Sequence, residues 1–124
     1  MKILIVDDEL DVEMLFRQKF RQEVKSSKIE LVFAFSGKEA LELLEKENPP
    51  NVMYVFSDIN MPGMTGLELL EQVRIRFPQI KISMISAYGD KENHDRAMQS
   101  GAKEFFTKPI DFNSLKKEIS ELIN

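Results

Sequence analysis

Five polar residues suited to phosphoryl chemistry stand at the ends of short apolar runs. Such runs end at Asp7 and Asp8, at Asp58, at Ser86 and at Lys108. If each run is a strand of one parallel sheet, these residues share its carboxyl edge, where open α/β sheets bind ligands. Three carboxylates that converge repel one another and resist ionisation unless a cation lies among them. The sequence therefore predicts an acidic site that contains the Lys108 ammonium, a bound metal ion, or both.

The donor set indicates which metal such a site would hold. An all-oxygen site selects a hard ion, and a few carboxylates with water suit Mg²⁺ better than Ca²⁺, with Mn²⁺ as a substitute. The chain has no cysteine and one histidine, His94, which excludes thiolate zinc sites and disulfides. A divalent ion would also neutralise an incoming phosphoryl group and leave Asp58 as the nucleophile. The predicted chemistry is phosphoryl transfer onto a carboxylate.

The positioning elements follow from hydrophobic periodicity and capping signals. Because strands alternate with helices, we expect βαβ units and a parallel sheet covered on both faces. The predicted fold class is α/β, a single doubly wound five-stranded parallel sheet of order 2-1-3-4-5 with five helices, flavodoxin-like, filling residues 1–124. The predicted strands cover 3–6, 29–35, 52–56, 80–85 and 104–107, and the predicted helices cover 11–25, 36–47, 65–77, 91–100 and 112–123.

Composition narrows the class of protein. The 124 residues are 43% hydrophobic and 31% charged, which is typical of one globular domain and argues against disorder. A net charge of −4 is unfavourable for binding nucleic-acid phosphates. The longest apolar runs, 31–35 and 52–56, are too short to span a bilayer, and the start lacks the features of a signal peptide. We expect a soluble cytoplasmic protein that binds neither nucleic acid nor membrane.

Four motifs occur in a fixed order along essentially the whole chain. They are Ile3-Leu4-Ile5-Val6-Asp7-Asp8-Glu9, Ser57-Asp58-Ile59-Asn60-Met61-Pro62-Gly63-Met64-Thr65-Gly66, Ser86-Ala87 and Phe105-Phe106-Thr107-Lys108-Pro109. With these motifs the chain resembles the receiver domain of two-component response regulators. The resemblance implies a phosphorylation-dependent signalling switch, in which Asp58 accepts a phosphoryl group from a histidine kinase or a histidine phosphotransfer protein.

The resemblance also implies a metal-binding role for particular residues. Asp8 and Asp58 would ligate Mg²⁺ directly, and Asp7 would act largely through a water molecule. The backbone carbonyl of Asn60 would be the third protein ligand. Asn60, together with Tyr88, is also expected to limit access of water to the acyl phosphate and so to lengthen its lifetime.

Further roles implied by the resemblance concern the switch. Lys108 would pair with the phosphoryl oxygens, and Ser86 would hydrogen-bond one of them and draw its loop inward. Phe105 matches the aromatic switch position, and the Lys108–Pro109 peptide is expected to be cis. The output surface would be the helix at 91–100, the strand at 104–107 and the helix at 112–123, a face that also allows a homodimer. His94, in this first helix, is expected to be a solvated surface residue and not a ligand.

Other functions fit parts of the pattern. A haloacid-dehalogenase-like phosphatase also uses a strand-end aspartate and Mg²⁺, but it needs a second aspartate where this chain has Asn60. A receiver-like interaction scaffold that accepts no phosphate usually lacks an acidic residue or the lysine, and Asp7, Asp8, Asp58 and Lys108 are all present. An FMN site is disfavoured because the loop after the first strand is acidic. We therefore expect no turnover of a separate substrate. The downstream effector or fused output domain is not specified by the sequence.

Overall fold

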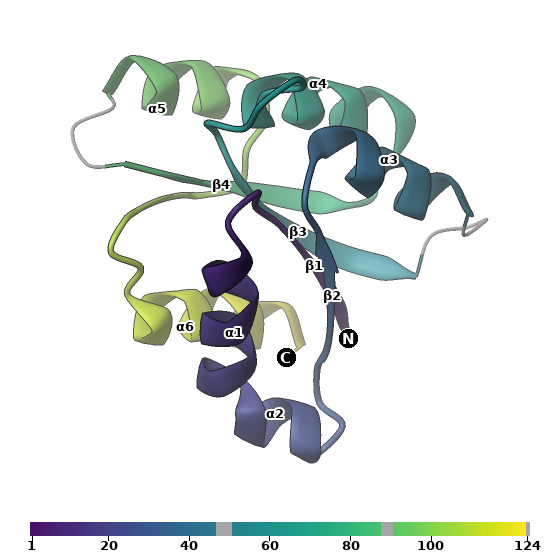
Figure 1. The fold of residues 1–124 in the computed structure, drawn as a ribbon, viewed down its shortest axis with the longest axis vertical. Helices are drawn as coiled ribbons and strands as arrows, with labels where there is room; N and C mark the ends of the chain where they lie inside the picture. The colour runs from purple at the N-terminus through teal and green to yellow at the C-terminus, as the bar shows by residue number, and fades with distance from the viewer. Residues whose placement is uncertain (47–50, 88–90, 124) are drawn as a thin grey trace.

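The computed structural model describes residues 1–46, 51–87 and 91–123, which form a parallel sheet between two layers of helices (Figure 1). Neighbouring strands pair in the order β2-β1-β3-β4-β5, and every pair is parallel. The predicted strand order is confirmed. The strands are β1 (Lys2–Val6), β2 (Glu30–Ala34), β3 (Val52–Asp58), β4 (Lys81–Ser86) and β5 (Phe105–Thr107); the helices are α1 (Leu10–Lys19), α2 (Arg21–Lys25), α3 (Gly37–Lys46), α4 (Gly66–Arg76), α5 (Lys91–Gln99) and α6 (Phe112–Ile123).

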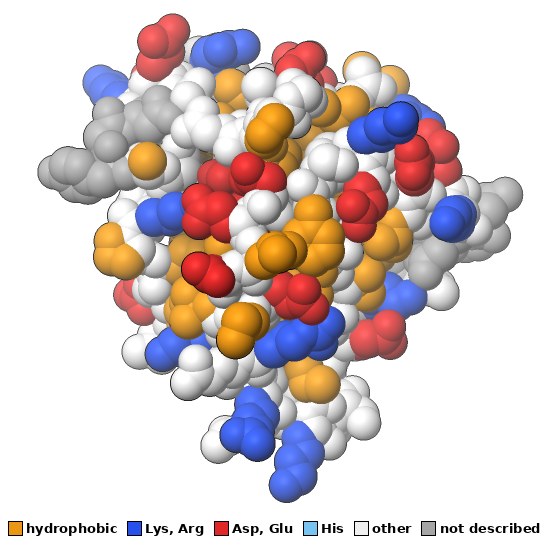
Figure 2. Space-filling view, viewed as in Figure 1, with side chains coloured by type: hydrophobic (Ala, Val, Ile, Leu, Met, Phe, Trp, Pro, Cys, Tyr) orange, Lys and Arg blue, Asp and Glu red, His pale blue; other side chains and the backbone are white. Residues whose placement is uncertain are grey.

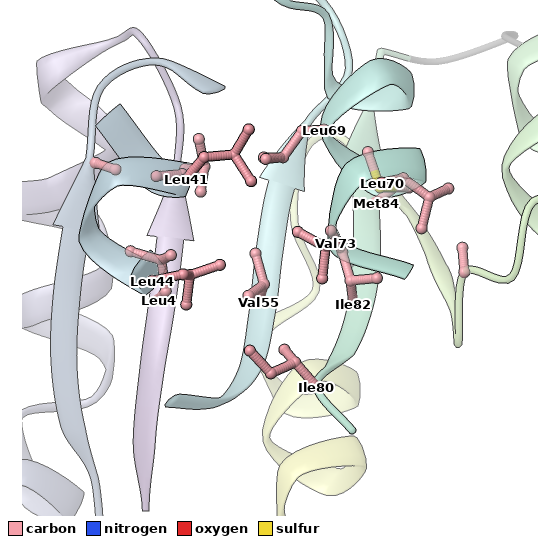
Figure 3. Close-up of a cluster of buried hydrophobic side chains, with 14 of the residues drawn as sticks. Leu4, Leu41, Leu44, Val55, Leu69, Leu70, Val73, Ile80, Ile82 and Met84 are labelled. Carbon is pink, nitrogen blue, oxygen red and sulfur yellow. The ribbon is translucent and has the colours of Figure 1, made fainter. Parts of the chain in front are cut away.

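The central strands are apolar on both faces because helices cover both. Along β1, Ile3 and Ile5 belong to the core under α1 and α6, whereas Leu4 belongs to the core under α3 and α4. Figure 3 shows Leu4 and Val55 of the sheet meeting side chains of α3 and α4. This two-sided burial explains why the first and third strands read as continuous apolar runs.

The helices divide between the two faces of the sheet. α3, α4 and α5 cover one face, and α1 and α6 cover the other (Figure 1). Because every neighbouring pair of strands is parallel, each strand ends at the same edge of the sheet before the chain continues into a helix. This carboxyl edge is where the candidate site lies.

The first predicted helix, over 11–25, is wrong in one respect. The structure divides it at Phe20, whose φ of −102° and ψ of 15° end α1 and begin α2, so the described residues contain six helices and not five. Phe20 is 1% exposed and stacks on Phe16 at 5.9 Å between ring centroids. Val24, four residues beyond Phe20 and so on the same side of a continuous helix, is 41% exposed. The chain bends because Phe20 stays in the core while the next turn buries nothing.

Local capping signals bound the other helices. Thr65 and Glu68 form a capping box at the start of α4. The Glu68 N–H donates to Oγ1 of Thr65 at 3.2 Å, and the Thr65 N–H donates to Oε1 of Glu68 at 3.0 Å. Gly101 ends the α5 segment with a φ of 101°, a conformation that favours glycine. Among the described residues, every helix is too short or too polar to cross a bilayer.

Candidate functional site

Asp7 and Asp8 carry the chain beyond the carboxyl end of β1. The Asp7 N–H donates to the carbonyl oxygen of Ala34 at 3.1 Å and so continues the pairing with β2. Oδ1 of Asp7 accepts the N–H of Glu9 at 2.9 Å, which fixes the carboxylate as the chain turns toward α1. Asp7 is buried and Asp8 is exposed. The pair therefore supplies one carboxylate inside the site and one at its mouth.

Asp58 is the last residue of β3, the strand beside β1. It is 5% exposed, and its Oδ1 accepts the N–H of Ile59 at 2.9 Å. Its carbonyl oxygen accepts the Ser57 hydroxyl at 2.9 Å. Opposite it in β4 stands Ile85. These bonds hold both the main chain and one carboxylate oxygen, and the second oxygen, Oδ2, faces Lys108.

Lys108 joins the two buried carboxylates. Its Nζ atom lies 3.6 Å from Oδ2 of Asp7 and 3.6 Å from Oδ2 of Asp58. Its backbone N–H donates to the carbonyl oxygen of Ser86 at 2.8 Å, which ties the lysine to the end of β4. The Lys108–Pro109 peptide bond is cis, the isomer that the resemblance implies. The predicted convergence of strand ends one, three, four and five is thus present.

Burial and mutual repulsion govern the ionisation of these groups. Burial and, to a lesser extent, the Asp7 carboxylate raise the pKa of Asp58 to about 6, against the opposing effect of Lys108. Burial likewise raises the pKa of Asp7, against the Glu9 N–H and Lys108. Burial lowers the pKa of Lys108, but the Asp58 and Asp7 carboxylates outweigh it and the pKa is raised overall. The site is short of positive charge at neutral pH.

A divalent cation would supply the positive charge that the site lacks. Oxygen atoms of Asp7, Asp8 and Asp58 lie within 4.8 Å of one another. Three ionised carboxylates and the single Lys108 ammonium leave two negative charges uncompensated. Carboxylate oxygens are ligands that Mg²⁺ takes, usually with several waters retained. The donor set and its charge therefore suit one Mg²⁺ ion.

Comparison with known protein families identifies a family with this arrangement. Residues 3–120 match the family model described as "Response regulator receiver domain". The chain belongs to this family. Receiver domains are signalling switches of two-component systems. The four motifs, the strand order and the acidic strand ends are therefore features of a receiver.

Individual relatives support the assignment of the receiver. Sporulation initiation phosphotransferase F of Bacillus subtilis is 29% identical over 98% of this chain and 93% of its own length. Response regulator protein PilR of Pseudomonas aeruginosa is 34% identical over 96% of this chain but only 25% of its own length. The receiver thus spans about a quarter of PilR. A crystal structure of response regulator protein TrrA from Thermotoga maritima, in complex with Mg²⁺-BeF, matches with a TM-score of 0.79 and 30% identity over 98% of this chain and 97% of TrrA.

Ser86 and Phe105 lie on adjacent strands of the receiver. Ser86 is the last residue of β4 and is fully buried. Phe105 begins β5, is half-buried and packs against the core under α3 and α4. Its ring also contacts the ring of His94 on α5, with 4.9 Å between centroids and 69° between planes. His94 is exposed, as expected, but it is not merely solvated.

Asn60 and Tyr88 are the two residues expected to lengthen the lifetime of the acyl phosphate. Asn60 is exposed, two residues beyond Asp58 on the loop that leads to α4. It lines a cavity of about 310 Å³ with residues of α4 and α5, Glu68 and Arg96 among them. Tyr88 lies outside the described residues. Of these two residues, the structure therefore gives the location of Asn60 only.

The sequence predicted no role in the site or the switch for three residues that the structure places in contact with it. The Glu9 N–H orients Asp7. Gly66 brings the start of α4 against Asp58, and its N–H donates to the carbonyl oxygen of Ile59 at 2.8 Å. His94 contacts Phe105. The glycine in the motif Thr65-Gly66 was a local signal for the close approach of α4 to Asp58. No local pattern in the sequence pairs His94 with Phe105.

Proposed function

We propose that this receiver is a phosphorylation-dependent switch that accepts a phosphoryl group on Asp58. The supporting observation is the arrangement of the buried Asp7 and Asp58 carboxylates around the Lys108 ammonium. An Asp58 oxygen attacks the phosphorus of a phosphohistidine, so an O–P bond forms while the P–N bond breaks. The imidazole leaves with the electron pair of that bond and takes up a proton. The product is an acyl phosphate on Asp58.

The residues of this chain divide the work of that step. Asp7, Asp8 and Asp58, with the backbone carbonyl of Asn60, would hold the Mg²⁺ ion. When bound, the ion neutralises charge on the phosphoryl group. The Ile59 N–H holds Oδ1 of Asp58, and Lys108 stands beside Oδ2, so its ammonium is placed to pair with the added phosphoryl oxygens. The chain turns over no separate substrate in this scheme.

Phosphorylation alters the charge at the carboxyl edge and so biases the switch. An acyl phosphate carries about two negative charges where the carboxylate carried one, and it adds acceptor oxygens. Only contacts that differ between two arrangements can shift a population. Ser86 would supply such a contact through its hydroxyl, and Phe105, near Ser86 on the neighbouring strand, would transmit it. The affected surface would be the output face, which consists of α5, β5 and α6.

The phosphodonor would be a histidine kinase or a phosphotransfer protein that docks on α1. Leu10 and Met14 of α1 are 68% and 72% exposed. Figure 2 shows hydrophobic side chains gathered beside acidic ones on the face that α1 occupies in Figure 1. A cavity of about 490 Å³ beside α1 is lined by Val12, Leu15, Lys108 and Phe112, among others. An apolar surface next to Lys108 is suited to a protein donor, since exposed apolar patches mark interaction sites.

Intact-mass measurement after incubation with acetyl phosphate and Mg²⁺ tests the acceptor role. We expect one added phosphoryl group in the parent chain, none in Asp58→Asn, and none when a chelator removes the metal. Asp11→Asn, an exposed aspartate of α1, is the matched control and should gain the group. A parent chain that never gains mass would contradict the proposal and favour the scaffold alternative.

A further inference from the structure

α5 is a polar helix with little buried surface. Of its described side chains, Ala97 is the buried one. His94 adds an aromatic contact, because its ring meets the ring of Phe105 of β5. The two attachments lie almost one turn apart on the helix, so they define its orientation on the sheet. Loss of either contact would therefore alter how the whole helix packs on the sheet.

Phe105 is held between two different environments. On one side it packs against the apolar core under α3 and α4. On the other side the His94 ring covers it at 4.9 Å in a T-shaped arrangement. The next residue, Phe106, belongs to the core on the opposite face of the sheet and contacts Phe56 at 6.0 Å. Phe105 is therefore the aromatic residue of β5 on the α5 side, and its half-buried orientation includes the contact with His94.

The His94 ring is itself oriented and not merely dangling in solvent. Its Nδ1 lies 3.2 Å from Oδ1 of Asp95, while 49% of the side chain is exposed. Phe105 and Asp95 thus hold the ring from two directions. An aromatic pair in such a geometry shifts a two-state equilibrium by about two- to tenfold. That range is sufficient to tune a switch without locking it.

We propose that His94 is a positioning residue that covers Phe105 and stabilises the resting orientation seen here. Inward movement of Phe105 breaks the contact with His94, and α5 then loses one of its side-chain contacts with the sheet. His94 would in this way set how readily the switch operates and would couple Phe105 to the surface of α5. The inference rests on the proposed function, because it requires occupancy of the Asp58 site to move Phe105.

Beryllofluoride with Mg²⁺, a stable mimic of the phosphoryl group, tests the inference. Since His94 favours the resting state, we expect His94→Ala to bind beryllofluoride about threefold more tightly than the parent chain. His94→Phe keeps an aromatic ring in place and should restore the parent affinity. Glu92→Ala, at an exposed position of the same helix, is the control and should leave the affinity unchanged. A purely structural defect would weaken binding and not strengthen it.

Hydrogen exchange supplies a second measurement. Amides of α5 should exchange faster in ligand-free His94→Ala than in the parent chain, and by a similar factor in the parent chain once beryllofluoride is bound. Equal beryllofluoride affinities of the parent chain and His94→Ala, or a His94→Phe variant that behaves like His94→Ala, would overturn the inference alone. Failure of the parent chain to bind beryllofluoride with Mg²⁺ would overturn the proposed function and, with it, this inference.

Discussion

Gly66 packs against Asp58 so closely that no side chain fits between them. A Cβ atom on Gly66 would lie 2.0 Å from the carbonyl oxygen of Asp58 and 2.7 Å from the Cα atom of Ile59. Real Cβ atoms do not approach backbone atoms this closely, and a backbone neighbour cannot rotate away. Glycine at the start of α4 is thus what lets the acceptor strand and this helix meet.

Gly66→Ala is therefore expected to damage both stability and phosphorylation. The backbone of Asp58 or of α4 must move, which should lower the free energy of unfolding by about 2 to 3 kcal/mol, and uptake of a phosphoryl group should fall. Urea unfolding and intact-mass measurement check the two effects. Gly63→Ala is the control, because its Cβ would meet open space and only its φ of 75° is unfavourable. It should cost about 1 kcal/mol and leave phosphorylation intact. Similar losses in the two variants would contradict the close approach.

Asp58→Asn should stabilise the receiver at neutral pH and not in acid. The pKa of Asp58 is about 6 in the folded chain, above the usual value of about 4 that an unfolded chain has. Between these values the folded state binds more protons than the unfolded state, so stability falls as pH rises through this window and stays low above it. Removing the charge should therefore add about 2 to 3 kcal/mol near pH 8 and about nothing near pH 4.

Urea unfolding at the two pH values, with a chelator present, measures this difference. Asp11→Asn, with an exposed carboxylate, should show no comparable dependence on pH. A gain in Asp58→Asn of equal size at both pH values would mean that ionisation of the buried carboxylate is not the cause.

Mg²⁺ should raise the melting temperature of the receiver, because the three carboxylates converge only in the folded chain. At a metal concentration a hundredfold above Kd, the free energy of unfolding should rise by about 2.7 kcal/mol. Asp8→Asn should remove most of this effect, and because Asp8 is exposed, it should leave the metal-free melting temperature nearly unchanged. Asp11→Asn should respond to Mg²⁺ like the parent chain. If Asp8→Asn responds equally, Asp8 is not a ligand.

The apolar surface of α1 should matter for a protein donor and not for a small one. Replacing Leu10 and Met14 together by alanine removes exposed apolar area while it preserves helix propensity. We expect transfer from a phosphorylated histidine phosphotransfer protein to slow by about tenfold or more, with unchanged uptake from acetyl phosphate. Ile75→Ala provides the control, since Ile75 of α4 is 75% exposed on another face. A slowing with both donors would place the defect in the acceptor site itself.

A buried polar network on the α6 side of the sheet should contribute to stability and not to phosphorylation. The Tyr54 hydroxyl lies 2.5 Å from Oγ of Ser83 and 3.4 Å from Oε1 of Glu118, which also binds Lys103. Burial raises the pKa of Tyr54, so its hydroxyl stays protonated. Tyr54→Phe should lower the free energy of unfolding by about 1 to 2 kcal/mol while acetyl phosphate uptake is retained. Lost uptake at full stability would refute this separation.

Patterns local in the chain determined where most strands and helices lie along the sequence, the residues at the strand ends and several caps. Period and capping placed α4 from Thr65 onward, because the hydroxyl of Thr65 and the carboxylate of Glu68 are close in sequence and satisfy each other's backbone. The acidic site was predictable as well. Parallel strands bring their carboxyl ends to one edge, and Asp7, Asp58 and Lys108 stand at such ends.

Only the tertiary structure decided the bend at Phe20, the approach of Gly66 to Asp58 and the contact of His94 with Phe105. Each depends on residues that meet through packing and not through spacing along the chain. The helical spacing of apolar residues continues past Phe20 to Val24. In the structure, however, Phe20 packs in the core and Val24 is exposed. A polar residue such as His94 carries no local sign of the ring it will meet. Long-range packing therefore decided the details on which the switch depends.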